Sequence, residues 1–440
     1  HFEKMLYDNA GLLANYVHAW QSFPYPVFSR VIRETVAWMN SWLSDRQQGG
    51  FYGSQDADMT LDDDGDYFTW TRAEAAEVLT PDELEVAGTY YDIGELGDMH
   101  HNPAKNVMHV KRPVEALAKE LRREPEEVAR VLEYARVKLA EARIKRPTPY
   151  VDRTIYTGWN AMAISAYLQA HGVMPDLDTR LGTRDFAIRT LDRILREAWS
   201  EQEGLEHVVA YAGGESGPRV PGVLDDYALM VHACLDAWEQ TLEMRYYDAA
   251  VLLAARMQRD FYDATGGGFF DTATGSDVTG ALVARRKPLQ DTPTPAGNPT
   301  AAAALLRLEE LSGDTRLREI AEETLEAFAG IVEHFGLFAG SYGLALERLL
   351  ATPQQIVIVG DDDEAARMES VAREGFAVNK MVLRVPRAVL ESGSLPPVLR
   401  STITQLPGLQ NAESFAVVCQ GTQCLPPVRG VAELQAALAR

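Results

Sequence analysis

The stretch Gly49-Gly50-Phe51-Tyr52-Gly53-Ser54-Gln55-Asp56-Ala57-Asp58 decides how the rest of the chain is organised. It follows an amphipathic helical segment, and its two leading glycines permit backbone angles that other residues avoid. Weaker copies recur at 204–207, 267–271 and 336–340. From Gly204 to Gly268 is 64 residues, and from Gly268 to Gly336 is 68. A recurring unit of helix, loop and helix indicates a repeat architecture.

Two kinds of helix alternate around these copies. Five segments are apolar on most sides and are predicted to be inner helices, at 2–21, 157–170, 225–238, 298–311 and 342–350. Four amphipathic segments are predicted to be outer helices, at 27–46, 183–199, 246–262 and 315–335. Such alternation is typical of an α/α toroid. The chain opens inside a helical pattern and looks like a fragment, so a ring of six pairs would need helices upstream.

The fold class predicted is therefore mainly α. An (α/α)6 toroid, incomplete at the N-terminus and with short β-hairpins in its loops, occupies 1–353, and a small α/β domain occupies 354–440. The wider spacing before Gly204 indicates an insertion at about 71–146. Thr71-Arg72-Ala73-Glu74 has the pattern of a capping box, and 81–91 and 124–144 are predicted helices.

Three strand predictions complete the sequence-based fold. Phe51-Tyr52 and Tyr67-Phe68-Thr69-Trp70 are expected to pair as a hairpin. Residues 106–111 are predicted to form a further strand. In the C-terminal segment, the apolar runs at 355–360, 381–385 and 415–419 are expected to form a parallel sheet.

Composition and charge exclude several classes of partner. The net charge of −22 argues against nucleic acid, which needs a basic footprint, and against an anionic membrane surface. No secretory signal opens the chain, and three cysteines suit a reducing compartment, so we expect a cytoplasmic protein. Cys419 and Cys424 are accordingly expected to be free thiols. The segment 355–364 (QIVIVGDDDE) lacks a dinucleotide fingerprint, and the acidic turn after Asp56 lacks calcium-loop spacing, so no cofactor or metal is predicted.

Several motifs together resemble one family, and the match spans essentially the whole chain. They are HFEKMLYDNA at 1–10, GGFYGSQDAD at 49–58, GWNAM at 158–162, DDYAL at 225–229, GGFFDTA at 267–273 and PAGNPTAAAAL at 295–305. The chain is similar to thioredoxin-domain-containing proteins related to spermatogenesis-associated protein 20. The resemblance implies a six-hairpin barrel like those of glycosidases and N-acylglucosamine 2-epimerases. It also implies an N-terminal thioredoxin-like domain, absent from this sequence, as the partner of the barrel.

Carboxylates dominate the loop ends of the predicted barrel. Glycosidic cleavage needs one carboxylic acid and one carboxylate, and Asp56, Asp58 and Asp226 are the catalytic candidates. Asp8 and Asp225 are candidate substrate-binding residues. The alternative interpretation is structural, because Asp225 and Asp226 stand where a helix-cap pair would stand, and Asp56 and Asp58 can stabilise a turn.

Histidines and neutral side chains supply the remaining candidates. In the 2-epimerases that the chain resembles, histidines do the acid–base work, so His1 joins the catalytic candidates with His207 as an alternative, whereas His18 and His232 are expected to pack in the core. Further substrate-binding candidates are Tyr52, Trp159, Asn160, Tyr227, Arg286 and Asn298. The aromatic residues among them can equally be core residues, and Arg286 can be an exposed charge.

The sequence thus favours a carbohydrate-active barrel, related to glycoside hydrolases or to sugar 2-epimerases, that holds a neutral saccharide in a polar funnel. Apolar helices that all begin from polar loops should place their N-termini at one rim, where unpaired N–H groups favour ionised Asp. The alternative is a non-catalytic binding or scaffold module that serves the thioredoxin-like domain.

Overall fold

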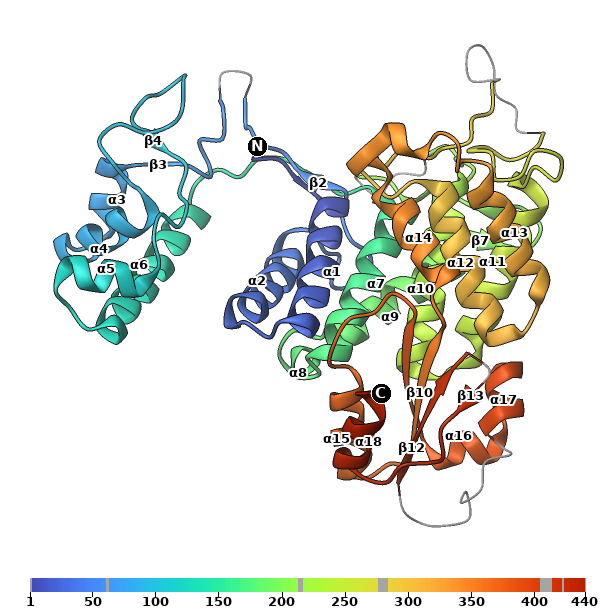
Figure 1. Ribbon diagram of the computed structural model, residues 1–440. Helices are drawn as coiled ribbons and strands as arrows, with labels where there is room; N and C mark the ends of the chain where they lie inside the picture. Colours follow the sequence, from blue (N-terminus) through green and yellow to red (C-terminus); the bar gives the residue numbers. More distant parts are fainter. Residues whose placement is uncertain are drawn as a thin grey trace. The chain divides into compact units, whose positions relative to one another are not determined.

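The computed structural model describes residues 2–60, 63–212, 217–275, 284–403, 414–421 and 423–439 (Figure 1). The chain divides into two compact units. The first combines residues 1–5 with 54–152, and the second combines 6–53 with 153–440. The insertion predicted at 71–146 lies within the first unit, and the division at residue 353 stays a prediction.

The second unit alternates inner and outer helices as the sequence predicts. The inner helices are α1 (Leu6–Ser22), α7 (Thr157–Val173), α10 (Leu224–Thr241), α12 (Gly297–Ser312) and α14 (Gly340–Leu350). The outer helices are α2 (Pro26–Trp42), α9 (Thr183–Glu197), α11 (Met244–Phe261) and α13 (Thr315–Glu326). A short helix, α8 (Asp176–Leu181), joins α7 to α9, and a 3-10 segment, η2 (Val332–Ala339), precedes α14.

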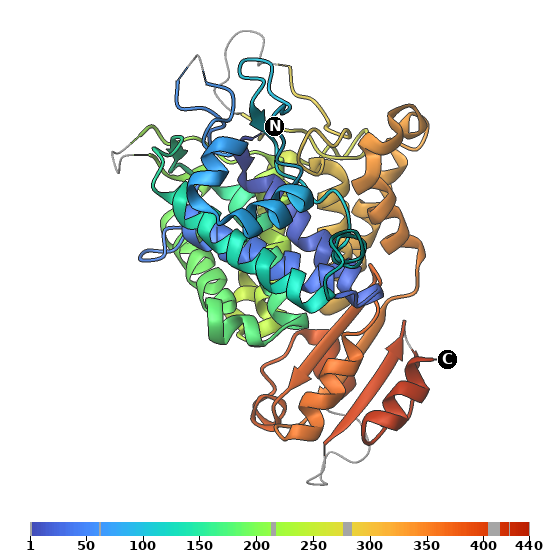
Figure 2. The same ribbon diagram turned by 90° about the vertical axis from the view of Figure 1, so that its left-hand side faces the viewer.

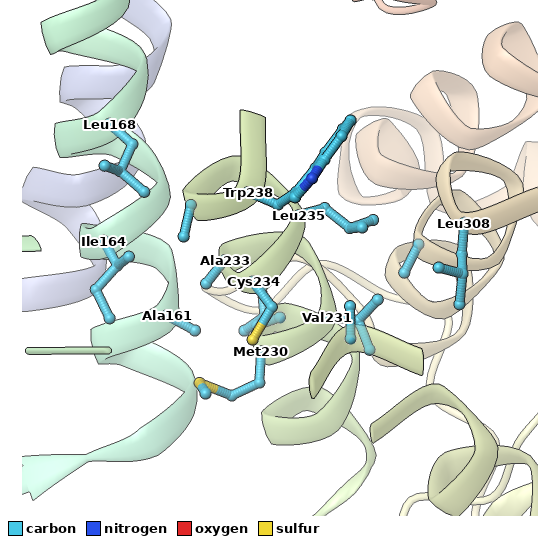
Figure 3. Packing of buried hydrophobic residues seen from close by; sticks show 14 of the residues in the cluster. Ala161, Ile164, Leu168, Met230, Val231, Ala233, Cys234, Leu235, Trp238 and Leu308 are labelled. Atoms are coloured by element: carbon cyan, nitrogen blue, oxygen red, sulfur yellow. The ribbon is translucent and has the colours of Figure 1, made fainter. Parts of the chain in front are cut away.

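Burial explains the difference between the two kinds of helix. On α10 every residue from Asp226 to Trp238 except the partly exposed His232 is buried, because α7, α11 and α12 all pack against it. Figure 3 shows α10 between α7 and α12, with Ile164 and Leu168 on one side and Leu308 on the other. Inner helices pack in chain order from α1 to α14. Among the described elements the two end helices, α14 and α1, do not pack on each other in this way, so the series is open there.

One hydrogen bond is repeated in three hairpins. In each, the backbone N–H of the residue after the glycine donates to a side chain in the first turn of the following inner helix, and we call this contact the hairpin lock. The three locks are Phe51 N to Asn160 Oδ1 at 2.7 Å, Leu205 N to Tyr227 Oη at 2.7 Å and Phe269 N to Asn298 Oδ1 at 2.6 Å. Both asparagine amides also donate back to the carbonyl of the same phenylalanine. The copies at 49–58, 204–207 and 267–271 are therefore structural repeats, whereas the copy predicted at 336–340 lies in the η2 segment and the first residue of α14.

The first unit has a hydrophobic core of its own, built around Trp70. Its helices are α3 (Arg72–Val78), α4 (Pro81–Tyr91), α5 (Val114–Leu121) and α6 (Pro125–Ile144), and Thr71 and Glu74 form the predicted capping box. Its strands form a three-stranded sheet of β1 (Lys4–Met5), β2 (Ser54–Gln55) and β5 (Val151–Asp152), and a pair of β3 (Trp70–Thr71) with β4 (Lys105–Asn106).

Two strand predictions in this region are wrong. Trp70 pairs with Asn106, and not with the Phe51-Tyr52 segment, because the Asn106 side-chain amide also donates to the Trp70 carbonyl and fixes that partner. The strand predicted at 106–111 is confined to Lys105–Asn106. In addition, the helix predicted from residue 2 begins at Leu6, because Lys4 and Met5 pair with the β2 strand.

The C-terminal segment contains a four-stranded sheet of order β11-β10-β12-β13. The strands are β10 (Gln354–Val359), β11 (Lys380–Val385), β12 (Phe415–Gln420) and β13 (Gln423–Cys424), and the helices are α15 (Asp363–Ala372), α16 (Arg387–Ser392), α17 (Pro397–Ile403) and α18 (Val431–Leu438). The predicted parallel sheet is a mixed one: β10 runs parallel to β11 through the α15 crossover but antiparallel to β12.

The two faces of this sheet belong to different cores. Ile356 and Ile358 share a core with residues of α15 and α18, whereas Val357 and Val359 join the core of the helical unit. Figures 1 and 2 show the strands and helices of this segment as ribbons. The expectation of free thiols is also wrong in the structure. The β12–β13 register places Cys419 directly opposite Cys424, and the two form a disulfide.

Candidate functional site

The loops that enter α7, α10 and α12 carry a cluster of polar side chains, which we call the helix-start site: Asp225, Asp226, His207 and Asp271. Two short strand pairs support it, β6 (Ile155–Tyr156) with β9 (Val208–Ala210), and β7 (Trp199–Ser200) with β8 (Gly204–Leu205). The β9 strand follows His207 directly and joins the loop before α10 to the loop before α7. The helix starts therefore meet around these residues.

Asp226 is fixed by three hydrogen bonds and is only 1% exposed. Its Oδ1 accepts from Gly158 N at 2.8 Å, and its Oδ2 accepts from Val223 N at 2.9 Å, which closes the start of α10. A Cβ on Gly158 would approach Asp226 Oδ1 to 2.9 Å, so glycine provides the space for this contact. Asp226 thus ties the starts of α7 and α10 together.

His207 makes the third contact with Asp226. Its Nδ1 lies 2.8 Å from Asp226 Oδ2, and the side chain is 34% exposed. The hydrogen bond to Asp226 raises the pKa of His207, whereas burial opposes that shift. With Nδ1 held as the donor to Asp226, the other ring nitrogen, Nε2, can accept or donate a proton outside this pair.

Asp225 has the opposite environment. It is partly buried, and in the described part of the chain no group donates a hydrogen bond to it. Burial, followed by the negative charges of Asp226 and Asp271, raises the pKa of Asp225 to about 7, and His207 only partly opposes this. A Cβ on Gly297, the first residue of α12, would come within 2.2 Å of Asp225 Oδ1. Asp225 is therefore a carboxylic acid that can hold its proton near neutral pH.

A line of aromatic rings leads away from His207. The ring centroid of Tyr156 lies 5.7 Å from His207 and 4.6 Å from Trp159, and Trp159 lies 4.8 Å from Tyr7. All three aromatic residues are partly exposed. Tyr156 was missed in the sequence, although it directly precedes the first turn of α7. Partly exposed rings beside polar groups suit the apolar face of a sugar ring.

Other predicted residues have structural contacts in this part of the molecule. Asn160 and Asn298 are fully buried, and each amide is bonded to backbone groups within the protein. The Tyr227 hydroxyl accepts the hydrogen bond of the second hairpin lock, and its ring packs against Trp199 and Phe261. These three side chains hold the helix-start site together, and their predicted role in substrate binding stays a prediction.

The remaining predicted residues are not brought together by contacts with this cluster. In the second unit, Asp8 is exposed in the first turn of α1, Tyr52 lies under Arg153, and Arg286 is exposed while its backbone pairs with Asp271. Asp56 and Asp58 belong to the first unit, where Asp58 Oδ1 accepts from Gly65 N at 2.9 Å as a turn-stabilising residue would. His1 lies outside the described residues.

A cavity of about 360 Å³ lies elsewhere in the second unit, along the later turns of the inner helices. His18 and His232, predicted to be core residues, line it instead, together with Asp236 and Arg307. None of the predicted site residues lines this cavity. In α10 the polar residues His232, Asp236 and Glu239 follow one another at helical spacing, and this signal was available in the sequence.

The described residues hold neither a metal-ligand cluster nor a membrane-spanning helix. They contain no group of three or more His, Cys, Asp or Glu side chains arranged to hold a metal ion. Within the same ranges, no helix has the length and apolar character needed to cross a membrane.

Comparison with known proteins confirms the resemblance seen in the motifs. The chain is 27% identical to spermatogenesis-associated protein 20 of Homo sapiens over 99% of its own length and 58% of the relative's. The protein of the same name from Rattus norvegicus is 28% identical, over 99% of this chain and 57% of the relative. The chain therefore spans little more than half the length of these relatives. No family model matches it.

Solved structures give weaker likenesses. A D-mannose isomerase matches with a TM-score of 0.42 and 11% identity, over 84% of this chain and 70% of that one. Cellobiose 2-epimerase from Spirochaeta thermophila DSM 6192 matches with a TM-score of 0.38 and 13% identity, over 78% and 58%. These scores are too low to support an argument about the site.

Proposed function

We propose that this chain, a homologue of the proteins named spermatogenesis-associated protein 20, is a carbohydrate-active enzyme whose chemistry takes place at the helix-start site. In this proposal Asp225 donates a proton to the substrate, and Nε2 of His207 accepts one. Asp226 is a positioning residue that fixes the ring orientation of His207. The position of the partly buried Asp225 beside the Asp226–His207 pair, whose atoms lie 2.8 Å apart, is the observation that carries the proposal.

Acid–base catalysis near neutral pH needs groups whose proton affinities are separated by their surroundings. Burial and the charges of Asp226 and Asp271 drive Asp225 toward its neutral form, and His207 opposes them only in part. Asp226 accepts a backbone N–H on each oxygen and lies 2.8 Å from His207, whereas in the described part of the chain no hydrogen bond reaches the Asp225 carboxyl. Two adjacent carboxyls with such different partners suit a proton donor beside a positioning residue.

The class of substrate follows from charge and from the aromatic line. The carboxyls of Asp226 and Asp271 would repel an anion at this site. Trp159 and Tyr156 offer partly exposed rings beside His207, where a sugar could pack its apolar face. A neutral saccharide fits both features.

Two reactions are compatible with these groups. In an epimerase, His207 would remove the proton from the carbon beside a carbonyl, and Asp225 would protonate the opposite side or the carbonyl oxygen. In a hydrolase, Asp225 would protonate the leaving glycosidic oxygen while Asp271 activates water or attacks. The histidine, held in one orientation by Asp226, favours the first reaction.

The experiment distinguishes the two reactions and tests the proposal. The protein is incubated in D₂O with neutral aldoses and with neutral disaccharides. Deuterium entering the carbon beside the carbonyl, seen by NMR, reports proton abstraction, whereas new reducing ends report hydrolysis. We expect Asp225→Asn and His207→Gln to remove the exchange while the protein stays folded. Exchange or hydrolysis that survives in both variants at the wild-type rate would refute the proposal.

The alternative function is a non-catalytic scaffold that serves the thioredoxin-like domain implied by the resemblance. It is favoured by the structural use of Asn160, Asn298 and Tyr227, three of the residues predicted to face a substrate. Absence of turnover for the whole panel, together with binding of the barrel to that domain, would support the scaffold.

A further inference from the structure

The cavity of about 360 Å³ in the second unit has walls from two parts of the chain. Helices α1, α7, α10, α12 and α14 provide most of it, and the segment from Arg373 to Val382, which follows α15 and includes the first half of β11, provides the rest. Its volume falls within the range of about 300–1,000 Å³ that is usual for sites of small molecules.

A buried ion-pair network lines the helical wall. Arg307 of α12 donates through Nη2 to Asp236 Oδ1 and to Glu239 Oε1, both at 2.7 Å, and its Nη1 lies 3.0 Å from His232 Nδ1. His232 uses its other nitrogen on the Thr300 carbonyl at 3.1 Å. Burial, followed by the charge of Arg307, lowers the pKa of His232 to about 3, so the imidazole is neutral. Every group in this network is therefore oriented and rigid.

The C-terminal segment closes the cavity by direct contacts. Arg348 of α14 pairs with Glu310 at 2.9 Å and also donates to the Val378 carbonyl. Gln21 of α1 donates to the Arg373 carbonyl at 2.8 Å. The ring of His18 stacks on Phe376 with centroids 3.9 Å apart. The sheet and the helical ring are thus joined at this wall.

Among the described residues that line the cavity, two have a buried polar atom without a hydrogen-bond partner, Gln169 Oε1 and Asp236 Oδ2, and only the second belongs to a carboxylate. Asp236 is 7% exposed and uses Oδ1 on Arg307, but its Oδ2 is buried and accepts no hydrogen bond. An unpaired carboxylate oxygen of this kind costs free energy unless a ligand or water donates to it. The same cavity has apolar walls at Val17, Leu168 and Val173.

The basic residues of the cavity are already engaged. Arg307 pairs with two carboxylates, and Arg373 pairs with Glu369 at 2.9 Å. Lys380 donates to the Ala372 carbonyl at 3.1 Å and to the Glu374 carbonyl at 2.7 Å. An anion would have to compete with these bonds. A cation would have to enter beside four basic side chains that line the same space. An uncharged molecule with hydroxyl donors meets neither obstacle.

We propose that this cavity is a second ligand site, which binds a small uncharged polyhydroxylated molecule through a hydroxyl donated to Asp236 Oδ2. The site is separate from the helix-start site, since no residue of the latter lines it. Binding there would hold the C-terminal sheet against the inner helices, because Phe376, Arg373 and Val378 form its far wall. The inference does not depend on the proposed catalysis.

D-Mannitol is a suitable probe because it has hydroxyls but no carbonyl or glycosidic bond to react. Polyols stabilise proteins generally by exclusion from the surface, so melting temperature is a poor readout. Saturation-transfer NMR on the whole chain measures direct binding instead. We expect mannitol to receive saturation from the wild-type protein, and we expect Asp236→Asn to weaken its binding at least about tenfold, as loss of a hydrogen bond to a charged group implies.

Two variants that fill the cavity make the test decisive. Ala303→Phe adds a ring from α12, and Leu344→Trp adds one from α14 at a residue that is 53% exposed and tolerant of size. Both should abolish the mannitol signal, whereas Asp225→Asn should leave it unchanged. Circular dichroism checks that each variant is folded, and Leu344→Trp serves alone if Ala303→Phe does not fold.

The inference is overturned if mannitol gives no signal with the wild-type protein, or a signal that both filled variants retain. It is equally overturned if spermidine or inorganic phosphate, tested in parallel, is the probe that the filled variants exclude. Failure of the proposed catalysis has a different signature, namely isotope exchange that persists in Asp225→Asn.

Discussion

The two ends of helix α10 carry carboxylates in contrasting surroundings. At its start, burial and the charges of Asp226 and Asp271 raise the pKa of Asp225 to about 7, and His207 opposes them only in part. Three turns later, Asp236 shares Arg307 with Glu239. The first arrangement makes a proton available for chemistry, and the second makes a rigid charged wall. Two aspartates on one helix therefore have different surroundings, because α12 places the Arg307 guanidinium beside Asp236 and not beside Asp225.

The largest effect should come from removing that guanidinium. Arg307→Met leaves Asp236 and Glu239 buried without a counter-charge, and we expect a loss of about 3–5 kcal/mol in the free energy of unfolding. Denaturant unfolding measures it. Arg245→Met is the matched control: its pair with Asp192 is 54% and 30% exposed, so the loss should stay below about 1 kcal/mol. Equal losses of unfolding free energy in the two variants would contradict the expected difference between the buried and the exposed ion pair.

The next effect tests the other end of the helix. The pKa of Asp225 in the folded protein lies above the ordinary value of 3.8, so the stability that the neutral form provides is lost as pH rises through about 7. Asp225→Asn removes this loss. Between about pH 4 and pH 8, we expect the free energy of unfolding of the variant to rise relative to that of the wild type, by up to about 4 kcal/mol. Unfolding curves across that range check it, and parallel pH profiles would contradict it.

A smaller effect concerns the scaffold that both ends share. Asn298→Ala leaves the N–H of Phe269 buried without an acceptor, and we expect a cost of about 1–3 kcal/mol in the free energy of unfolding. Asn160→Ala should cost a similar amount, since its lock with Phe51 is the same. Tyr227→Phe, which keeps the ring, should cost less. Thermal and chemical unfolding compare the three, and a negligible cost for both asparagines would show that the locks are not structural.

The smallest effect is a change in titration. The hydrogen bond to Asp226 raises the pKa of His207, so its contribution to stability is present below pH 6.5 and fades as pH rises through the raised value. We expect an NMR titration of the ring to show a pKa above 6.5 in wild type and a lower one in Asp226→Asn. A pKa that does not move would mean that Asp226 does not orient His207.

Local patterns were sufficient to predict the helical part of the fold. The alternation of inner and outer helices depends on periodicity within each segment, and all nine predicted helices are present. Strand partners were harder to predict, because Trp70 pairs with Asn106 across 36 residues. The direction of β12 and the disulfide between Cys419 and Cys424 likewise depend on how separate segments meet.

The candidate site was predictable only in part. Asp225 and Asp226 were recognised because they precede an apolar helix, and His207 because it ends a hairpin. The opposite roles of the two aspartates could not be predicted, since they depend on Gly158 and His207 on one side and Gly297 on the other. The cavity was missed although His232, Asp236 and Glu239 stand at helical spacing in one segment, because its other walls come from segments that are distant in the sequence.

The hairpin locks imply an order of events in folding. The locks of Tyr227 and Asn298 join residues 22 and 29 positions apart, but that of Asn160 joins residues 109 apart. The first unit intervenes, and its ends are brought side by side where Ser54 pairs with Asp152. If that unit folds first, the loop to be closed shrinks to about eleven residues, which lowers its entropic cost by about 2 kcal/mol. An inserted unit with its own core can therefore act as a clamp that hastens closure of the repeat it interrupts.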